Sequence, residues 1–149
     1  MRFFDTNILV YAATSQDPCK QRIARELIAH ALDVNGDGCT SMQALQEFTA
    51  VLVRKCPDAR DMIEKWYSVF YRLIATEVTS DMVRNAIWIQ YEYKIQYYDA
   101  LMIAAAEKVG CHEILTEDLN DGQIYRGMMA VNPFKPCHSN YQPRGSSRV

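Results

Sequence analysis

The chain has 149 residues, 49% of them hydrophobic, which suits one folded domain with a core and excludes an intrinsically disordered chain. Its formal net charge of -2 excludes a strongly basic surface, so a nucleic acid would have to bind through a local basic cluster or through metal ions. No hydrophobic run approaches the roughly 20 residues of a membrane span, and a charge interrupts the start Met1-Arg2-Phe3-Phe4-Asp5 too early for a signal peptide, so we expect a cytoplasmic protein.

Strands and helices are predicted to alternate along the chain. Phe3 and Phe4 form a buried strand that ends at Asp5, and a helix follows at once. Further helices are predicted over residues 42–55, 59–74 and 98–109, and two more are predicted without fixed ends. One opens after Asp17-Pro18 and has an apolar stripe from Ile23 to Leu32, and the other follows Ser80 or Asp81 and carries Val83, Ile87 and Ile89. Further strands are predicted over 39–40, 77–79, 113–116 and 130–131. Ser80 or Asp81 is expected to cap the helix that follows them. This alternation predicts an α/β fold, with a parallel sheet covered by helices on both faces.

The chain changes character near its end and contains an odd number of cysteines. Residues 1–135 are predicted to form one domain, and residues 136–149, rich in Asn, Pro, Gly, Ser and Arg, a flexible tail. No Cys-x-x-Cys pair occurs, so we expect reduced thiols and neither a disulfide framework nor a zinc site at Cys19, Cys39, Cys56, Cys111 and Cys137.

Four acidic residues stand out by position. Asp5 and Asp118 each follow an apolar strand, so in a parallel sheet both emerge at the same edge. Asp99 shares a helix face with apolar residues, and Glu47 borders the apolar stripe of its helix. Taken singly, these residues also suit helix caps, a turn or a solvated helix face. Together they predict a carboxylate cluster for a hard cation such as Mg²⁺ or Mn²⁺; the three histidines have no predicted role.

These acidic segments resemble the motifs of the PIN domain in order and approximate spacing. The matching segments are Phe4-Asp5-Thr6-Asn7, Gln46-Glu47-Phe48, Tyr98-Asp99-Ala100-Leu101 and Thr116-Glu117-Asp118-Leu119-Asn120-Asp121-Gly122. Val131-Asn132-Pro133-Phe134 is also similar to many members, so the resemblance covers nearly the whole chain. The sequence most resembles small prokaryotic members, the VapC-type toxins of toxin–antitoxin pairs.

The resemblance implies a three-layer α/β/α PIN fold and a metal-dependent ribonuclease whose products carry a 5′-phosphate and a 3′-hydroxyl. Asp5, Asp99 and Asp118 would hold one or two Mg²⁺ or Mn²⁺ ions, and Glu47 would orient a water molecule. The residues expected to orient these carboxylates are Thr6, Asn7 and Asp121, and Asp121 is also an alternative ligand.

The resemblance also implies partners. RNA would be the substrate, an antitoxin protein would insert a basic side chain or peptide into the acidic pocket, and the chain would form a homodimer. Candidate contacts to RNA are Lys20, Arg22, Arg25, Arg54 and Lys55, although such residues also suit a solvated helix face. The aromatic residues expected at a core, at a dimer surface or against stacked bases are Trp66, Tyr67, Phe70 and Tyr71.

Other functions fit the sequence less well. The segment from Asp33 to Gly38 begins like an EF-hand loop, but Ala44 stands where a bidentate Glu is required, so we expect a turn. A receiver-type module needs adjacent acids after the first strand, and a haloacid-type phosphatase needs a second Asp where Asn7 stands. A catalytically silent PIN fold that binds RNA or another partner remains the alternative to a nuclease.

Overall fold

A computed structural model describes residues 1–138 of the chain as alternating strands and helices. The strands are β1 (Arg2–Phe4), β2 (Gly38–Ser41), β3 (Ile74–Thr76), β4 (Glu113–Leu115), β5 (Ile124–Tyr125) and β6 (Met128–Val131). The helices are α1 (Thr6–Ala13), α2 (Pro18–Ala31), α3 (Met42–Lys55), α4 (Arg60–Tyr71), α5 (Ser80–Tyr93), α6 (Tyr97–Val109) and α7 (Lys135–His138). Within the described part of the chain, none of these helices has both the length and the apolarity that spanning a membrane requires.

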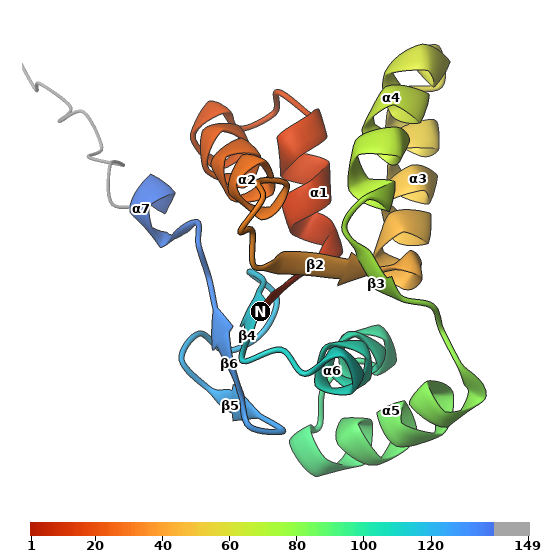
Figure 1. Cartoon of the computed structure of the whole chain (residues 1–149), viewed down its shortest axis with the longest axis vertical. Coiled ribbons are helices and arrows are strands. Elements are labelled where there is room, and N and C mark those ends of the chain that lie inside the picture. Colours follow the sequence, from red (N-terminus) through yellow and green to blue (C-terminus); the bar gives the residue numbers. More distant parts are fainter. Residues whose placement is uncertain (139–149) are drawn as a thin grey trace, which may run out of the picture.

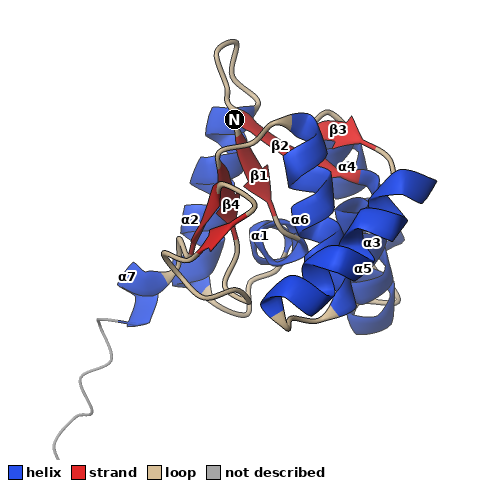
Figure 2. Ribbon diagram, turned by 90° about the horizontal axis from the view of Figure 1, so that it is seen from below, coloured by secondary structure: helices blue, strands red, loops and turns tan. Residues whose placement is uncertain are grey.

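The strands form one sheet in the order β3-β2-β1-β4-β6-β5, with helices on both faces (Figure 1). Helices α1 to α4 cover one face, and α5 and α6 cover the other (Figure 1). Because side chains alternate along a strand, Phe4 of β1 packs in the first layer of the core and Phe3 in the second. Figure 2 shows the strands lying among the helices. The predicted three-layer α/β/α architecture is therefore confirmed.

The sheet departs from the predicted parallel arrangement at one edge. Strands β1 to β4 and β6 pair in parallel, but β5 pairs with β6 in an antiparallel hairpin. The hairpin turns at Arg126 and Gly127, whose φ angles are 51° and 82°, as two-residue hairpin turns require. Arg-Gly is a weak turn signal and β5 has two residues, so the sequence does not predict this hairpin.

The strand predicted at residues 77–79 lies earlier in the chain, at Ile74–Thr76, so that prediction is wrong. Helix α4 ends at Tyr71, and the carbonyl of the buried Leu73 already accepts a hydrogen bond (2.9 Å) from the Thr40 backbone N–H at β2. The predicted cap is also wrong: the side chain of Thr79, rather than Ser80 or Asp81, accepts a hydrogen bond from the Met82 N–H of α5.

The prediction that all cysteines are reduced is wrong for one pair. Cys19, at the start of α2, forms a disulfide with Cys137, which lies in α7. The two cysteines are 118 residues apart, so short-range spacing patterns of cysteines do not predict that they pair. Cys39, Cys56 and Cys111 are free thiols. The described chain thus continues in helical form to residue 138, past the predicted boundary at 135, and the rest of the predicted tail lies outside the described residues.

Two other sequence features have structural explanations. The Asp33–Gly38 segment is the predicted turn between α2 and β2, and its Asp37 carboxylate pairs with Arg2 at 2.8 Å rather than facing a calcium site. Of the four aromatic residues of α4, Phe70 is buried and stacks on Trp66 with ring centroids 5.2 Å apart, whereas Tyr67 and Tyr71 are exposed. Half of this aromatic cluster therefore belongs to the core.

Candidate active site

Asp5 lies where β1 ends and α1 begins. Its carboxylate caps α1 by accepting a hydrogen bond from the Thr6 N–H (2.6 Å), and its other oxygen accepts from Thr116 Oγ1 (2.6 Å) and Asn7 Nδ2 (2.9 Å). Burial raises the pKa of Asp5 to about 7, although the Thr116 hydrogen bond opposes this rise and the charge of Asp118 adds to it. The cap predicted as an alternative role is real, but the residue is also part of a cluster.

Asn7 joins Asp5 to Asp118, which follows β4. Asn7 Nδ2 lies 3.2 Å from Asp118 Oδ2 and 3.3 Å from Thr116 Oγ1, and the Asp118 backbone N–H donates to the same hydroxyl at 3.0 Å. Thr116 and Asn7 therefore hold the two strand-end carboxylates in place. Asn7 was predicted in this role, but Thr116 was not, even though it belongs to the quoted Thr116-Glu117-Asp118 motif.

The other two acids come from helices. Glu47 of α3 accepts hydrogen bonds from Thr6 Oγ1 (3.2 Å) and from Gln43 Nε2 (2.6 Å). Asp99 lies in the first turn of α6, and its carboxylate accepts no hydrogen bond from another described residue. Burial raises the pKa of Asp99, and the charges of Asp118 and Glu47 raise it further.

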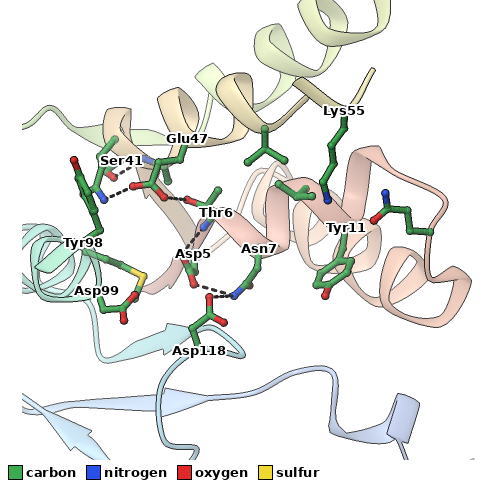
Figure 3. Close-up of a pocket in the computed structure, with 16 residues that line it drawn as sticks. Asp5, Thr6, Asn7, Tyr11, Ser41, Glu47, Lys55, Tyr98, Asp99 and Asp118 are labelled. Carbon is green, nitrogen blue, oxygen red and sulfur yellow. Dashed lines mark hydrogen bonds between the residues drawn. The ribbon is translucent and has the colours of Figure 1, made fainter. Parts of the chain in front are cut away.

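The four acids line one cavity of about 310 Å³ (Figure 3). Thr6, Asn7 and Tyr11 line the same cavity. Asp121 does not: its carboxylate accepts a hydrogen bond from the Asn132 N–H (2.6 Å) and pairs with Lys135. These contacts hold the pKa of Asp121 below its usual range. The structure thus brings together the predicted residues Asp5, Glu47, Asp99, Asp118, Thr6 and Asn7, and leaves Asp121 outside.

The donor set suits a hard cation. Within residues 1–138, no three acidic, His or Cys side chains stand close enough to hold a metal ion without rearrangement. The residues nevertheless fit such an ion chemically, because the cavity offers carboxylate oxygens that repel one another and need a positive charge. In addition, the buried Asn7 Oδ1 and Gln43 Oε1 have no hydrogen-bond partner among the described residues. Asp5, Asp99 and Asp118 are the carboxylates that would converge on the ion.

A cluster of Tyr11, Lys20 and Glu117 borders the cavity and was not predicted. Tyr11 Oη donates to Glu117 Oε1 (2.5 Å), and Lys20 Nζ lies 2.5 Å from Glu117 Oε2 and 3.0 Å from Tyr11 Oη. The two charged side chains are only 12% and 21% exposed, so Lys20 is neither a free RNA contact nor a solvated residue. Glu117 is neutralised by this pair, whereas its neighbour Asp118 faces the acidic cavity. In an extended segment neighbouring side chains point in opposite directions, and this is the one sequence signal that Glu117 and Asp118 have different surroundings.

Comparisons with known proteins agree with the fold. The family model of the PIN domain matches residues 2–125. Among similar solved structures, VapC20 of Mycobacterium tuberculosis, a sarcin-ricin loop cleaving toxin, has a TM-score of 0.61 and 19% identity over 76% of this chain and 87% of that chain.

A toxin–antitoxin complex from Klebsiella pneumoniae has a TM-score of 0.62 and 21% identity, covering 89% of this chain and 98% of that chain. VapBC2 from Rickettsia felis, solved with a promoter DNA fragment, has a TM-score of 0.61 and 15% identity, covering 87% and 96% of the two chains. No curated protein matches the sequence significantly. The predicted family is confirmed by the match over residues 2–125: this chain belongs to the PIN domain family.

Proposed function

We propose that this protein is a Mg²⁺- or Mn²⁺-dependent endoribonuclease that acts in the cytoplasm as the toxin of a toxin–antitoxin pair. The observation that carries this proposal is the meeting of Asp5, Glu47, Asp99 and Asp118 in one cavity, where their hydrogen-bond donors are all neutral. The PIN fold and its structural neighbours, which are toxins or toxin–antitoxin complexes, support it further.

Each side chain has a role in this proposal. Asp5, Asp99 and Asp118 would hold the cation, and Thr116 and Asn7 orient two of these carboxylates by hydrogen bonds. Glu47, held by Thr6 and Gln43, orients a water molecule for attack on the phosphodiester. When bound, the cation acidifies water and neutralises charge on the phosphate. Hydrolysis would leave a 5′-phosphate and a 3′-hydroxyl.

The test is cleavage of a mixed pool of structured RNAs by metal-free protein supplemented with Mg²⁺ or Mn²⁺. Wild type is compared with Asp5→Asn and Asp99→Asn, and each is repeated with EDTA. Asn keeps the size of the side chain and removes its charge. Asp121→Asn is the matched control, because this acid pairs with Lys135 outside the cavity. Circular dichroism confirms that every variant is folded.

We expect wild type and Asp121→Asn to cut, and both cavity variants and EDTA to abolish cutting. If the cavity variants cut as fast as wild type, the four acids are not the active site. If folded wild type cuts no RNA with either metal, the nuclease assignment fails and a catalytically silent PIN fold replaces it.

We also propose an antitoxin that inserts a basic side chain or peptide into the acidic cavity. The neighbours from Klebsiella pneumoniae and Rickettsia felis are toxin–antitoxin complexes, and the four carboxylates give the cavity the complementary charge. Co-expression of the protein encoded by the adjacent gene should suppress RNA cleavage. Cleavage that continues at the same rate despite a stable complex would contradict insertion into this cavity.

A homodimer is the last part of the proposal. Tyr67 and Tyr71 of α4 are exposed side by side, with ring centroids 6.0 Å apart, and so offer an apolar contact to a second copy. Light scattering should give twice the chain mass of 17.1 kDa, and Tyr67→Ser combined with Tyr71→Ser should give the single mass. A wild type with the single mass at all concentrations would refute the dimer.

A further inference from the structure

The acidic cavity has two different ends (Figure 3). Lys55, from the last turn of α3, lines one end near Tyr11. Tyr98, from the first turn of α6, lies at the other end beside Asp99. The carboxylates of Asp5 and Glu47 lie between them (Figure 3). A polymer that crosses the carboxylates would therefore meet a cation on one side and an aromatic ring on the other.

Lys55 is the one cationic side chain among the described residues that line the cavity. It is exposed and has no ion pair or hydrogen bond with another described residue. Lys20, just beyond the cavity wall, differs from Lys55 because its ammonium group already donates hydrogen bonds to Glu117 and Tyr11. The charge of Lys55 is therefore available to an anion that enters the cavity, and a phosphodiester is an anion of suitable size.

Tyr98 presents an aromatic face to the solvent at the cavity rim. Its side chain is 65% exposed, while the neighbouring Tyr97 packs against the core and holds its ring edge-on, with ring centroids 5.5 Å apart. An exposed aromatic ring beside a catalytic pocket is a platform on which a nucleobase can stack. Stacking requires a base that is not enclosed in a duplex, so this ring favours unpaired nucleotides.

We propose that Lys55 and Tyr98 are substrate-binding residues that hold unpaired RNA across the cavity: Tyr98 stacks on a base, and Lys55 binds a phosphate on the far side of the scissile bond. This inference rests on the proposed ribonuclease function, since it assumes that the bond to be cut lies over the four acids. It adds a path for the bound strand across the cavity and assigns binding to two residues outside the carboxylate cluster.

The test is the affinity for a short unstructured RNA labelled with a fluorophore, measured by anisotropy in Ca²⁺, with gels to verify that the RNA stays intact. The same RNA annealed to its complement is the second ligand. Lys55→Gln and Tyr98→Ala remove the two contacts, and Lys55→Arg and Tyr98→Trp conserve them. Lys65→Gln and Tyr91→Ala are matched controls, because both residues are exposed and line no part of this cavity.

We expect the unpaired RNA to bind more tightly than the duplex, and Tyr98→Ala to weaken it about 5- to 100-fold. Lys55→Gln should reduce the slope of log K against log salt by about 0.7, whereas Tyr98→Ala should leave that slope unchanged. The conservative and control variants should bind like wild type. Equal affinity for unpaired and duplex RNA, or wild-type affinity in Lys55→Gln or Tyr98→Ala, would overturn the inference.

Measuring RNA cleavage by the same proteins distinguishes a failure of this inference from a failure of the proposed ribonuclease function. If wild type cuts RNA while both variants bind it normally, the binding residues are wrong and the nuclease remains. If the variants lose binding while wild type cuts nothing, the binding residues remain and the nuclease assignment fails. If wild type neither binds nor cuts RNA, both are refuted.

Discussion

The charged side chains differ between the edge of the sheet at which the parallel strands begin and the edge at which they end. At the edge where β1, β2 and β4 begin, Arg2 forms an ion pair with Asp37 at 2.8 Å, and the amino terminus lies at hydrogen-bond distance, 2.7 Å, from His112 Nδ1. At the edge where these strands end, the four carboxylates share one cavity and their hydrogen-bond donors are uncharged. The same strands thus begin at an edge whose acid, Asp37, has a cationic partner, and end at an edge whose four cavity acids have none among the described residues.

This difference distinguishes structural charges from functional ones. A partly buried carboxylate without a positive partner is unfavourable, and folded proteins retain such groups chiefly where a ligand or a reaction requires them. Burial and the charges of neighbouring carboxylates, above all Asp118, raise the pKa values of Asp5 and Asp99, whereas Arg2 holds the pKa of Asp37 below its usual range. Mutations at the two edges should therefore change different properties of the protein.

The largest effect is expected on cleavage. Glu47→Gln and Asp118→Asn should each reduce the rate of RNA cleavage by more than about 100-fold, because each removes a charge from the cavity that acts on metal or water. Asp37→Asn, an acid removed from the opposite edge, should cut at the wild-type rate. Initial rates at saturating Mn²⁺ measure this difference, and similar losses in all three variants would erase the distinction between the edges.

A second effect should appear in the pH dependence of stability without metal. The folded pKa of Asp5, about 7, lies above its ordinary value of 3.8, so between these values the folded state binds more protons than the unfolded state. Stability should therefore fall as the pH rises from about 4 to 7, by on the order of 2–4 kcal/mol. Urea unfolding in EDTA should show this fall in wild type and a smaller one in Asp5→Asn. An identical pH dependence in both proteins would contradict the burial of this charge.

The Lys20–Glu117 ion pair is a second test of the difference between the edges. It lies at the edge where the strands end, but its acid has a cationic partner, as Asp37 has at the opposite edge. Lys20→Met leaves the Glu117 carboxylate, 21% exposed, without its cation, and should lower the free energy of unfolding by about 1–3 kcal/mol. The double variant Lys20→Met/Glu117→Gln should recover much of this loss. Denaturation of all four proteins in the cycle measures the coupling, and additive losses would show that the pair is not coupled.

The smallest effect is expected at the amino edge. The Arg2–Asp37 ion pair is partly solvated, with Asp37 43% exposed, so Asp37→Asn should lower stability by less than about 1 kcal/mol at neutral pH. The lowered pKa of Asp37 means that its contribution is present above the usual Asp pKa and disappears as the pH falls through the lowered value. Urea midpoints at neutral and acidic pH measure it, and a larger neutral-pH loss would mean that this edge is more than a solvated pair.

The sequence predicts the parts of the site that depend on local patterns. Asp5 and Asp118 are found because each follows a short apolar strand, and parallel strands bring such ends together. Glu47 and Asp99 are weaker predictions from helix position alone, and the family resemblance is what unites them with the other two. Asp121 was placed with them by its motif, but its partners, Lys135 and Asn132, hold it outside the cavity.

The rest depends on contacts between distant segments. Lys20 and Glu117 are 97 residues apart, and Cys19 and Cys137 are 118 apart, so neither pair leaves a spacing signal in the sequence. Strand β5 is only two residues long, too short for a pattern of alternation, and its turn residues are untypical. Local chemistry therefore predicts which groups end a strand, but packing decides which distant groups neutralise them.

The most direct test of the central claim is calorimetric titration of metal-free protein with Mn²⁺, because it examines the carboxylate cavity without requiring the correct RNA. Wild type should bind Mn²⁺ saturably, Asp5→Asn and Asp99→Asn should bind it at least about tenfold more weakly, and Asp37→Asn should match wild type. Equal Mn²⁺ affinity in all four folded proteins would contradict a metal site at the carboxyl edge of the sheet.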